Sequence, residues 1–145
     1  MNAWQVGAAA VALSAAGPAK TTREVMIPAQ RIPWAVEAPG QPQRLGPLWG
    51  VRSTGPAGTL LRVPGGFNAP VHTHTADYRA VVIEGVWKHW PDGATKDNVL
   101  ALRPGSYWTQ QARKWHADAC ISKVPCTILL INSDPYKTIV KPSRQ

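Results

Sequence analysis

The sequence predicts an all-β protein with a single domain, and three of its features support this prediction. Fourteen prolines and twelve glycines are spread over 145 residues and divide the apolar residues into short runs. Short apolar runs bounded by turn residues are typical of strands. A chain of this length can build one hydrophobic core but not two. No internal repeat or low-complexity tract suggests another architecture.

About ten strands are expected from these runs, taken in chain order. Before the central histidine segment they are expected at Glu24–Ile27, Arg31–Val36, from Leu48 onward, and at Thr59–Val63. After it they are expected at Tyr78–Ile83, Val86–Trp90, Val99–Leu102, Ser106–Gln110, Lys114–Ala119, Thr127–Asn132 and Tyr136–Val140. No helix is expected beyond the N-terminal segment, because the later runs are short and β-branched or aromatic.

The first 19 residues form a separate segment. Ala3–Ala19 is apolar and rich in alanine, with no charged side chain before Lys20. The stretch is too short to span a bilayer comfortably and ends in small residues, which is typical of a secretory signal. The sequence therefore predicts a signal at residues 1–19, a domain at 20–145, and a secreted or periplasmic protein without a membrane anchor. Because the usual positive start is missing, a truncated start or a packed alanine-rich helix is the alternative.

Two cysteines, Cys120 and Cys126, flank a polar turn between two strand-like runs. Facing positions across a hairpin lie within bridging distance, and an exported protein folds in an oxidising compartment. A disulfide between them is expected. The alternative is a free thiol, since Cys120 has the same strand parity as His116 and could point toward a metal.

The chain is basic, with a net charge of +8. Its lysines and arginines are scattered singly, and the longest basic run is Arg113-Lys114. Scattered charges indicate a solvated surface and not a groove that follows a phosphate backbone. No nucleic-acid partner is expected.

The segment that carries the chemistry is Gly66–Gly85, which contains His72 and His74. Residues i and i+2 of a strand share one face, so both imidazoles can point at a single centre. A third histidine, His116, lies in a distant strand. Three neutral imidazoles on a β scaffold make an open metal site with room for water or substrate.

This arrangement resembles the cupin superfamily. The first cupin motif is matched by Gly66, His72, His74 and Gly85, with Tyr78 at the place of its glutamate. The second motif is matched by Gly105 and His116, with Gln111, Arg113 and Cys120 at the places of its proline, glycine and asparagine. The resemblance covers roughly residues 57–132 and is closest to small RmlC-like cupins without an assigned activity. It implies a jelly-roll barrel with a metal or one small ligand at its mouth, and a homodimer.

Tyr78 bears on the metal and on catalysis. The glutamate that it replaces would supply a hard anionic oxygen, which suits manganese or ferrous iron. An all-imidazole site favours copper, with zinc, iron or nickel as alternatives. Tyr78 could be an axial ligand, a proton donor or an electron relay, or simply an interior aromatic whose hydroxyl has a partner. Asp118 either orients His116 or faces solvent.

Tryptophan is unusually frequent, with seven residues in 145. Indole rings are good platforms for sugar rings and also fill small β cores. Trp87 and Trp90 flank His89 near a turn, so these three residues are the candidates for a substrate-binding rim. The alternative places the indoles in the core and His89 at the surface.

Two classes of function remain. The first is a secreted mononuclear copper oxidoreductase that acts oxidatively on a polysaccharide such as cellulose, by analogy with small secreted copper cupins. The second is a non-redox zinc enzyme, or a protein that binds a metal or small ligand. The fold alone does not decide between them, since cupins host many activities.

Overall fold

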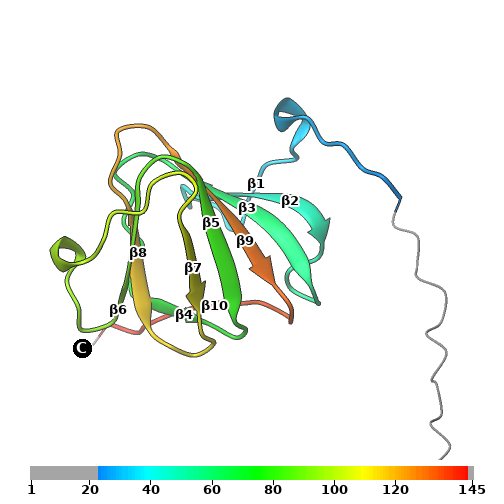
Figure 1. The fold of residues 1–145 in the computed structure, drawn as a ribbon. Coiled ribbons are helices and arrows are strands. Elements are labelled where there is room, and N and C mark those ends of the chain that lie inside the picture. Colours follow the sequence, from blue (N-terminus) through cyan, green and yellow to red (C-terminus); the bar gives the residue numbers. More distant parts are fainter. Residues whose placement is uncertain (1–22, 144–145) are drawn as a thin grey trace, which may run out of the picture.

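The computed structural model describes residues 23–143, which form two facing antiparallel sheets (Figure 1). The six-stranded sheet has the order β1 (Ala35–Val36), β2 (Arg44–Gly50), β3 (Ala57–Val63), β9 (Cys126–Asn132), β5 (Tyr78–Glu84) and β7 (Tyr107–Gln110). The four-stranded sheet has the order β10 (Thr138–Val140), β4 (His72–His74), β8 (His116–Cys120) and β6 (Trp87–Pro91). Two short 3-10 helices, Ala29–Arg31 and Lys96–Asn98, are the helices of the described part. The predicted all-β class is confirmed.

Three of the expected strands differ from the structure. Glu24–Ile27 is exposed and forms no strand, and of Arg31–Val36 only the last two residues pair, as β1. Pro28 and Pro33 interrupt this region, and a proline has no N–H to donate to a sheet. Val99–Leu102 contributes only an isolated bridge between Leu102 and Trp87.

Strand β2 begins at Arg44, earlier than expected, and contains Pro47. The proline is tolerated because β1 pairs only with the start of β2, at Arg44 and Leu45, so Pro47 needs no donor on that side. A register shift follows between Pro47 and Trp49. The proline therefore marks an irregularity within a strand and not the end of a connection.

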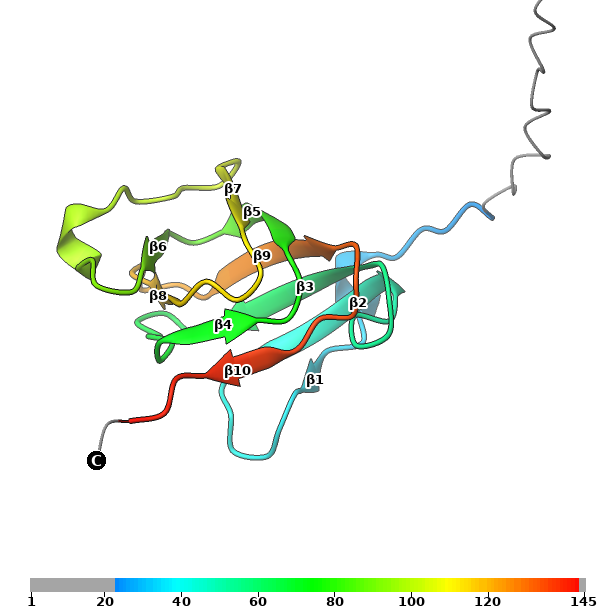
Figure 2. The ribbon, with the colours of Figure 1, turned by 90° about the horizontal axis from the view of Figure 1, so that it is seen from below.

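The core lies between the two sheets and follows the period of two along each strand. Alternate residues of β5 and β9 point inward, and Ala80, Val82 and Ile128 are almost fully buried. The same alternation directs His72 and His74 of β4 and His116 of β8 into the space between the sheets. Figure 2 shows β4 lying between β10 and β8. The sheet geometry thus sends the histidines to the interior.

The disulfide expected from the sequence is present between Cys120 and Cys126, with Cα atoms 5.8 Å apart. Its setting differs from the expected hairpin, because β8 and β9 belong to different sheets. The bond therefore ties the two sheets together at one end of the core. It also excludes Cys120 as a metal ligand in this state.

Residues 1–22 lie outside the described part, and so does the signal expected at 1–19. Within residues 23–143, no helix has the length and apolar character needed to cross a membrane.

Substituting Gly85 by alanine is expected to destabilise the fold by about 3 kcal/mol, from left-handed backbone strain and overpacking together. Its φ is +82°, and an added Cβ would lie 2.6 Å from Sγ of Cys126 and 2.8 Å from the carbonyl oxygen of Pro125. Gly66 is the matched control, since its φ is +76° but no atom lies within 4 Å of an added Cβ. Gly66→Ala should cost only the strain, about 1 kcal/mol. Denaturant unfolding measures both; equal losses would show that the close packing around Gly85 contributes nothing.

Candidate metal centre

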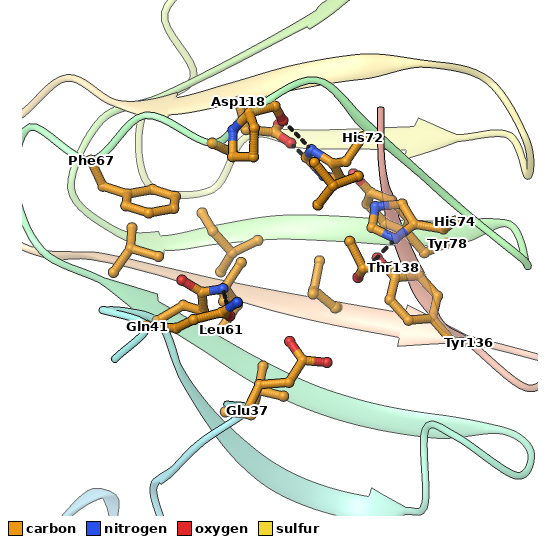
Figure 3. Close-up of a pocket in the computed structure, with 18 of the residues that line it drawn as sticks. Glu37, Gln41, Leu61, Phe67, His72, His74, Tyr78, Asp118, Tyr136 and Thr138 are labelled. Atoms are coloured by element: carbon orange, nitrogen blue, oxygen red, sulfur yellow. Dashed lines mark hydrogen bonds and ion pairs between the residues drawn. The ribbon is translucent and has the colours of Figure 1, made fainter. Parts of the chain in front are cut away.

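Three buried imidazoles converge between the sheets. His72 and His74 share the inner face of β4, and β8 pairs with β4 so that His116 stands opposite His72. The ring centroids of His72 and His116 are 4.3 Å apart, and those of His74 and His116 are 5.0 Å apart. One nitrogen of each ring lies within 4.8 Å of a nitrogen of each of the others. The structure therefore brings together the three residues that the sequence proposes as ligands (Figure 3 shows His72 and His74).

Hydrogen bonds fix which ring nitrogen is free. His72 Nδ1 lies 2.7 Å from the carbonyl oxygen of Pro70, and His116 Nδ1 lies 3.0 Å from that of Lys114. A carbonyl only accepts, so both Nδ1 atoms carry the proton and both Nε2 atoms keep a lone pair. The Nε2 of His116 is fully buried and has no hydrogen-bond partner. A buried acceptor without a partner fits a metal ion, which would use that lone pair.

The third imidazole is oriented less tightly. His74 Nδ1 lies 3.3 Å from the hydroxyl of Thr138 on β10. The ring stacks on Tyr136, with centroids 4.4 Å apart and planes 21° apart (Figure 3). The ring's free edge is thereby turned toward the other two histidines.

The environment keeps the imidazoles of His74 and His116 neutral. Burial lowers the pKa of His74 to about 2, and the neighbouring His72 and His116 lower it further. Burial also lowers the pKa of His116 to about 4, against the opposing effect of Asp118. A metal requires the neutral form of imidazole, so both side chains are ready to ligate at neutral pH without losing a proton.

Asp118 is the acidic group of the centre, and it is buried, not solvent-facing. Its Oδ2 lies 3.5 Å from Nε2 of His72 and 3.6 Å from Nε2 of His116. Its Oδ1 accepts hydrogen bonds from Trp87 Nε1 at 3.1 Å and from His89 Nδ1 at 2.7 Å. Burial alone would raise the pKa of Asp118, but the hydrogen bond and charge of His89 outweigh it, so this pKa is lowered. The carboxylate therefore remains ionised beside the histidines.

The sequence predicted His89 on a substrate-binding rim or at the surface. In the structure its side chain is instead mostly buried, with 14% exposed, and lies beside Asp118. Its Nε2 lies 2.9 Å from Oε1 of Gln110, whose amide nitrogen already donates to the carbonyls of Gln111 and Lys114. Oε1 must then accept, so Nε2 of His89 carries a proton. His89, His116 and Asp118 also lie close enough to hold a metal, but both ring nitrogens of His89 are already engaged. His89 is therefore a support for Asp118.

Tyr78, the candidate catalytic residue, lies at the inner end of β5 and is buried. Its ring centroid is 5.2 Å from that of His74, and its hydroxyl accepts a weak hydrogen bond of 3.4 Å from Trp108 Nε1. Burial raises its pKa well above the usual value, as does the charge of Asp118. The phenol is thus neutral and lies next to the histidines without the charge that the motif's glutamate would supply.

The two rim tryptophans do not form one platform. Trp87 is 2% exposed and belongs to the core, whereas Trp90 is half-buried. Their spacing of three along β6 places them on opposite faces of the strand. Trp87 contributes to the centre through its bond to Asp118, a role that the sequence did not indicate.

The second cupin motif also shows a departure with a structural reason. Arg113 stands where the motif has glycine, and it has a φ of 60°, in the left-handed region that glycine favours. Its backbone N–H donates to the carbonyl oxygen of His74 at 2.8 Å. The turn before β8 is therefore attached directly to the histidine strand despite the substitution.

A cavity of about 310 Å³ opens from the histidines toward the β1–β2 side of the molecule. Its walls are mainly apolar and include Leu61, Phe67, Trp108, Ile128 and Leu130. His72, His74, Tyr78 and Asp118 close one end (Figure 3). Sequence reasoning missed the polar residues of the other side, Glu37, Gln41 and Arg52, because no motif or period connects these segments to the histidines.

Comparison with known proteins agrees with this architecture. None of the curated proteins matches the chain. The polyketide cyclase RemF from Streptomyces resistomycificus is 16% identical with a TM-score of 0.66, covering 86% of this chain and 89% of its own. An RmlC-like cupin from Ralstonia eutropha JMP134 is 19% identical with a TM-score of 0.61, covering 77% of this chain and 69% of its own.

A third solved structure, described as a sugar phosphate isomerase from a cupin superfamily of Silicibacter pomeroyi DSS-3, is 16% identical with a TM-score of 0.63, covering 82% of this chain and 83% of its own. At these identities the similarity shows the fold, which is the expected cupin jelly roll. The family model described as "Domain of unknown function (DUF4437)" matches residues 28–144, most of the chain. The chain therefore has the cupin fold and belongs to the DUF4437 family.

Proposed function

We propose that this protein is a mononuclear metal enzyme in which Asp118 transfers a proton on a small substrate. His72, His74 and His116 would hold a transition metal ion. The observation that carries the proposal is the position of Asp118 Oδ2, at 3.5 and 3.6 Å from two of the free Nε2 atoms. When bound, the metal supplies Lewis-acid polarisation of a substrate oxygen.

Residues of the chain itself would accept the proton, orient the carboxylate and exclude water. Asp118 accepts a proton at Oδ2, while His89 and Trp87 hold Oδ1 and fix the carboxylate plane. A base held within reach of its proton in this way typically contributes about 10²–10⁴-fold to the rate. The apolar walls exclude water from the reacting atoms and leave Tyr78 as a neutral hydroxyl near His74.

The position of Asp118 broadens the choice of metal. The preference for copper followed from the missing glutamate, which left imidazoles alone as ligands. Asp118 returns a carboxylate oxygen to the same space from β8. The three imidazoles remain the proposed ligands, and with a carboxylate charge beside them they suit zinc, ferrous iron or nickel as well as copper. The cofactor is proposed as one transition metal ion per chain.

The geometry favours a small molecule over a polymer as substrate. The cellulose hypothesis drew in part on a tryptophan-rich rim at Trp87 and Trp90, but Trp87 is buried and Trp90 lies on the other face of β6. A cavity of about 310 Å³ is at the lower end of the range for small-molecule sites. Structural neighbours described as a cyclase and an isomerase lend support by analogy. Copper-dependent polysaccharide oxidation, export and a homodimer stay predictions from the sequence.

Metal content provides the first test. Protein purified without added metal is expected to contain about one equivalent of a transition metal by elemental analysis. His116→Gln should lower the affinity for that metal by about 100-fold or more, since even residues that only support metal ligands contribute about 10–100-fold. Asp92→Asn is the control, because Asp92 is a partly exposed carboxylate whose partner is Lys141. Wild-type protein that binds no transition metal would end the proposal.

The role of Asp118 is tested separately from metal binding. In a screen of small carbonyl and hydroxy compounds with metal-loaded protein, Asp118→Asn should lose about 10²-fold or more of any activity found, as expected for removal of a general base. The comparison is made at metal saturation, verified by elemental analysis. Full activity of metal-saturated Asp118→Asn would remove the carboxylate from the mechanism.

A further inference from the structure

A positive charge lies largely buried in the wall of the cavity. Arg52, in the turn after β2, lines the cavity, and its side chain is only 15% exposed. Its guanidinium carbon lies 4.6 Å from the ring centroid of Tyr136, which in turn stacks on His74 at 4.4 Å. Arg52 therefore packs on Tyr136, and Tyr136 packs on His74 of the metal centre.

The charge of Arg52 is incompletely paired. Among the described residues, its side chain makes one ion pair, from Nη2 to Oε1 of Glu37 at 3.2 Å. A guanidinium has five N–H donors, and a carboxylate can accept two of them side by side. This contact is a single one, and the Glu37 side chain is 41% exposed. A mostly buried guanidinium thus has donors left for a second partner, while its present partner is free to move into solvent.

Glu37 enters the site from a separate segment of the chain. It follows β1 directly and lies on the connection to β2, together with Gln41 (Figure 3). This connection runs past the outer side of β10, whose Thr138 lines the same cavity (Figure 2). The Glu37 carboxylate therefore meets Arg52 at the border between solvent and cavity.

We propose that Arg52 binds the carboxylate of a substrate whose apolar body fills the cavity, and that Glu37 occupies this subsite in its absence. This inference rests on the proposed function, because it assigns the substrate class of the same site. Within residues 23–143, Arg52 is the one arginine or lysine that lines the cavity. A single cation balances a monoanionic carboxylate, whereas a phosphate dianion would leave a negative charge unpaired. Leu61, Phe67 and the other apolar walls then select an aliphatic or aromatic body.

Matched pairs of probes test the charge requirement. Phenylacetate and hexanoate are compared with phenylacetamide and hexanamide, by titration calorimetry on the full chain, metal-free and zinc-loaded. In metal-free wild-type protein the acids should bind at least about 10-fold more tightly than the amides, because one charge-assisted pair is worth that much. Arg52→Gln should abolish this preference. Arg52→Lys should retain part of it, since lysine keeps the positive charge but lacks the two parallel N–H donors with which a guanidinium binds a carboxylate.

Glu37→Gln separates this inference from a general effect of charge. If Glu37 competes for the subsite, its neutralisation should tighten binding of the acids several-fold and leave the amides unchanged. Each variant is first checked for an unchanged melting curve and near-ultraviolet circular dichroism, since Arg52 also packs on Tyr136.

The outcomes also distinguish this inference from the proposed function. An acid preference that requires zinc and survives Arg52→Gln would place the carboxylate on the metal and overturn the inference, leaving the proposed function intact. An Arg52-dependent preference in a protein that binds no metal would uphold the inference and overturn the proposed function. Equal binding of acids and amides, or weaker acid binding by Glu37→Gln, would overturn the inference.

Discussion

Lowering the pH from 7 to 4 is expected to unfold the metal-free protein. In the unfolded chain histidine has a pKa of about 6.5. Folding lowers the pKa of His74 to about 2 and that of His116 to about 4, chiefly through burial. Between about pH 6.5 and 4 the unfolded state therefore holds two more protons than the folded state. Stability then falls by about 2.7 kcal/mol per pH unit near pH 5, which is large against a typical total of about 5–15 kcal/mol.

Denaturant unfolding at pH 7, 6, 5 and 4, with a chelator present, measures this slope. The destabilising effect of the two histidines should be absent above about pH 6.5 and should grow as the pH falls toward 4, because their folded pKa values are depressed. His74→Gln is the matched variant, since it removes one of the two groups and should reduce the slope by about half. A free energy of unfolding that stays constant from pH 7 to pH 5 would show that the buried imidazoles are protonated in the folded state.

Asp118→Ala is expected to destabilise the protein by about 3 kcal/mol, the cost of leaving two buried hydrogen-bond donors without an acceptor. The carboxylate has four neighbours: its Oδ1 accepts from His89 and Trp87, and its Oδ2 faces His72 and His116. Its removal leaves the indole N–H of Trp87 and the Nδ1–H of His89 without an acceptor. Thermal and denaturant unfolding of the metal-free protein at pH 7.5 would record the loss.

An exposed ion pair provides the control for Asp118. Asp92 pairs with Lys141, and both side chains are more than a third exposed. Asp92→Ala should therefore cost less than about 1 kcal/mol. The variant His89→Leu with Asp118→Leu removes both partners of the hydrogen bond together and should recover part of the loss, because replacing both partners by apolar groups can be nearly neutral. A loss for Asp118→Ala no larger than that for Asp92→Ala would contradict the buried network.

Part of the histidine centre could be predicted from the local sequence pattern, and part could not. The i, i+2 spacing of His72 and His74 determines that both side chains share a face, and the turn residues around them require strands. Because Asp118 lies two residues after His116, the sequence predicts that both side chains share a face of the strand. It does not predict which residues the Asp118 carboxylate contacts. Its contacts with Trp87 and His89 arise from the pairing of β6 with β8, which no local pattern encodes.

The predicted substrate-binding rim was wrong for His89 and Trp87 because the sequence does not show which face of their strand is covered. Both lie near a turn in the sequence, and turns are usually exposed. In the structure, however, β6 is hydrogen-bonded to β8 within the smaller sheet, so the inner face of β6 points at the metal centre. Which face of a strand is buried depends on the neighbours that cover it, and those neighbours come from distant parts of the chain.

The sequence by itself determined the all-β class, the two cupin motifs with their three histidines, and the pairing of Cys120 with Cys126, because these depend on spacing, residue type and turn chemistry. The tertiary structure decided that Asp118 completes the centre and that Arg52 and Glu37 meet across the cavity. The cavity brings together segments that are up to some 80 residues apart in the chain, since both Glu37 and Asp118 line it. Strand pairing within a sheet and the facing of the two sheets together bring such segments to one site, since a side chain extends only a few ångströms from its own strand.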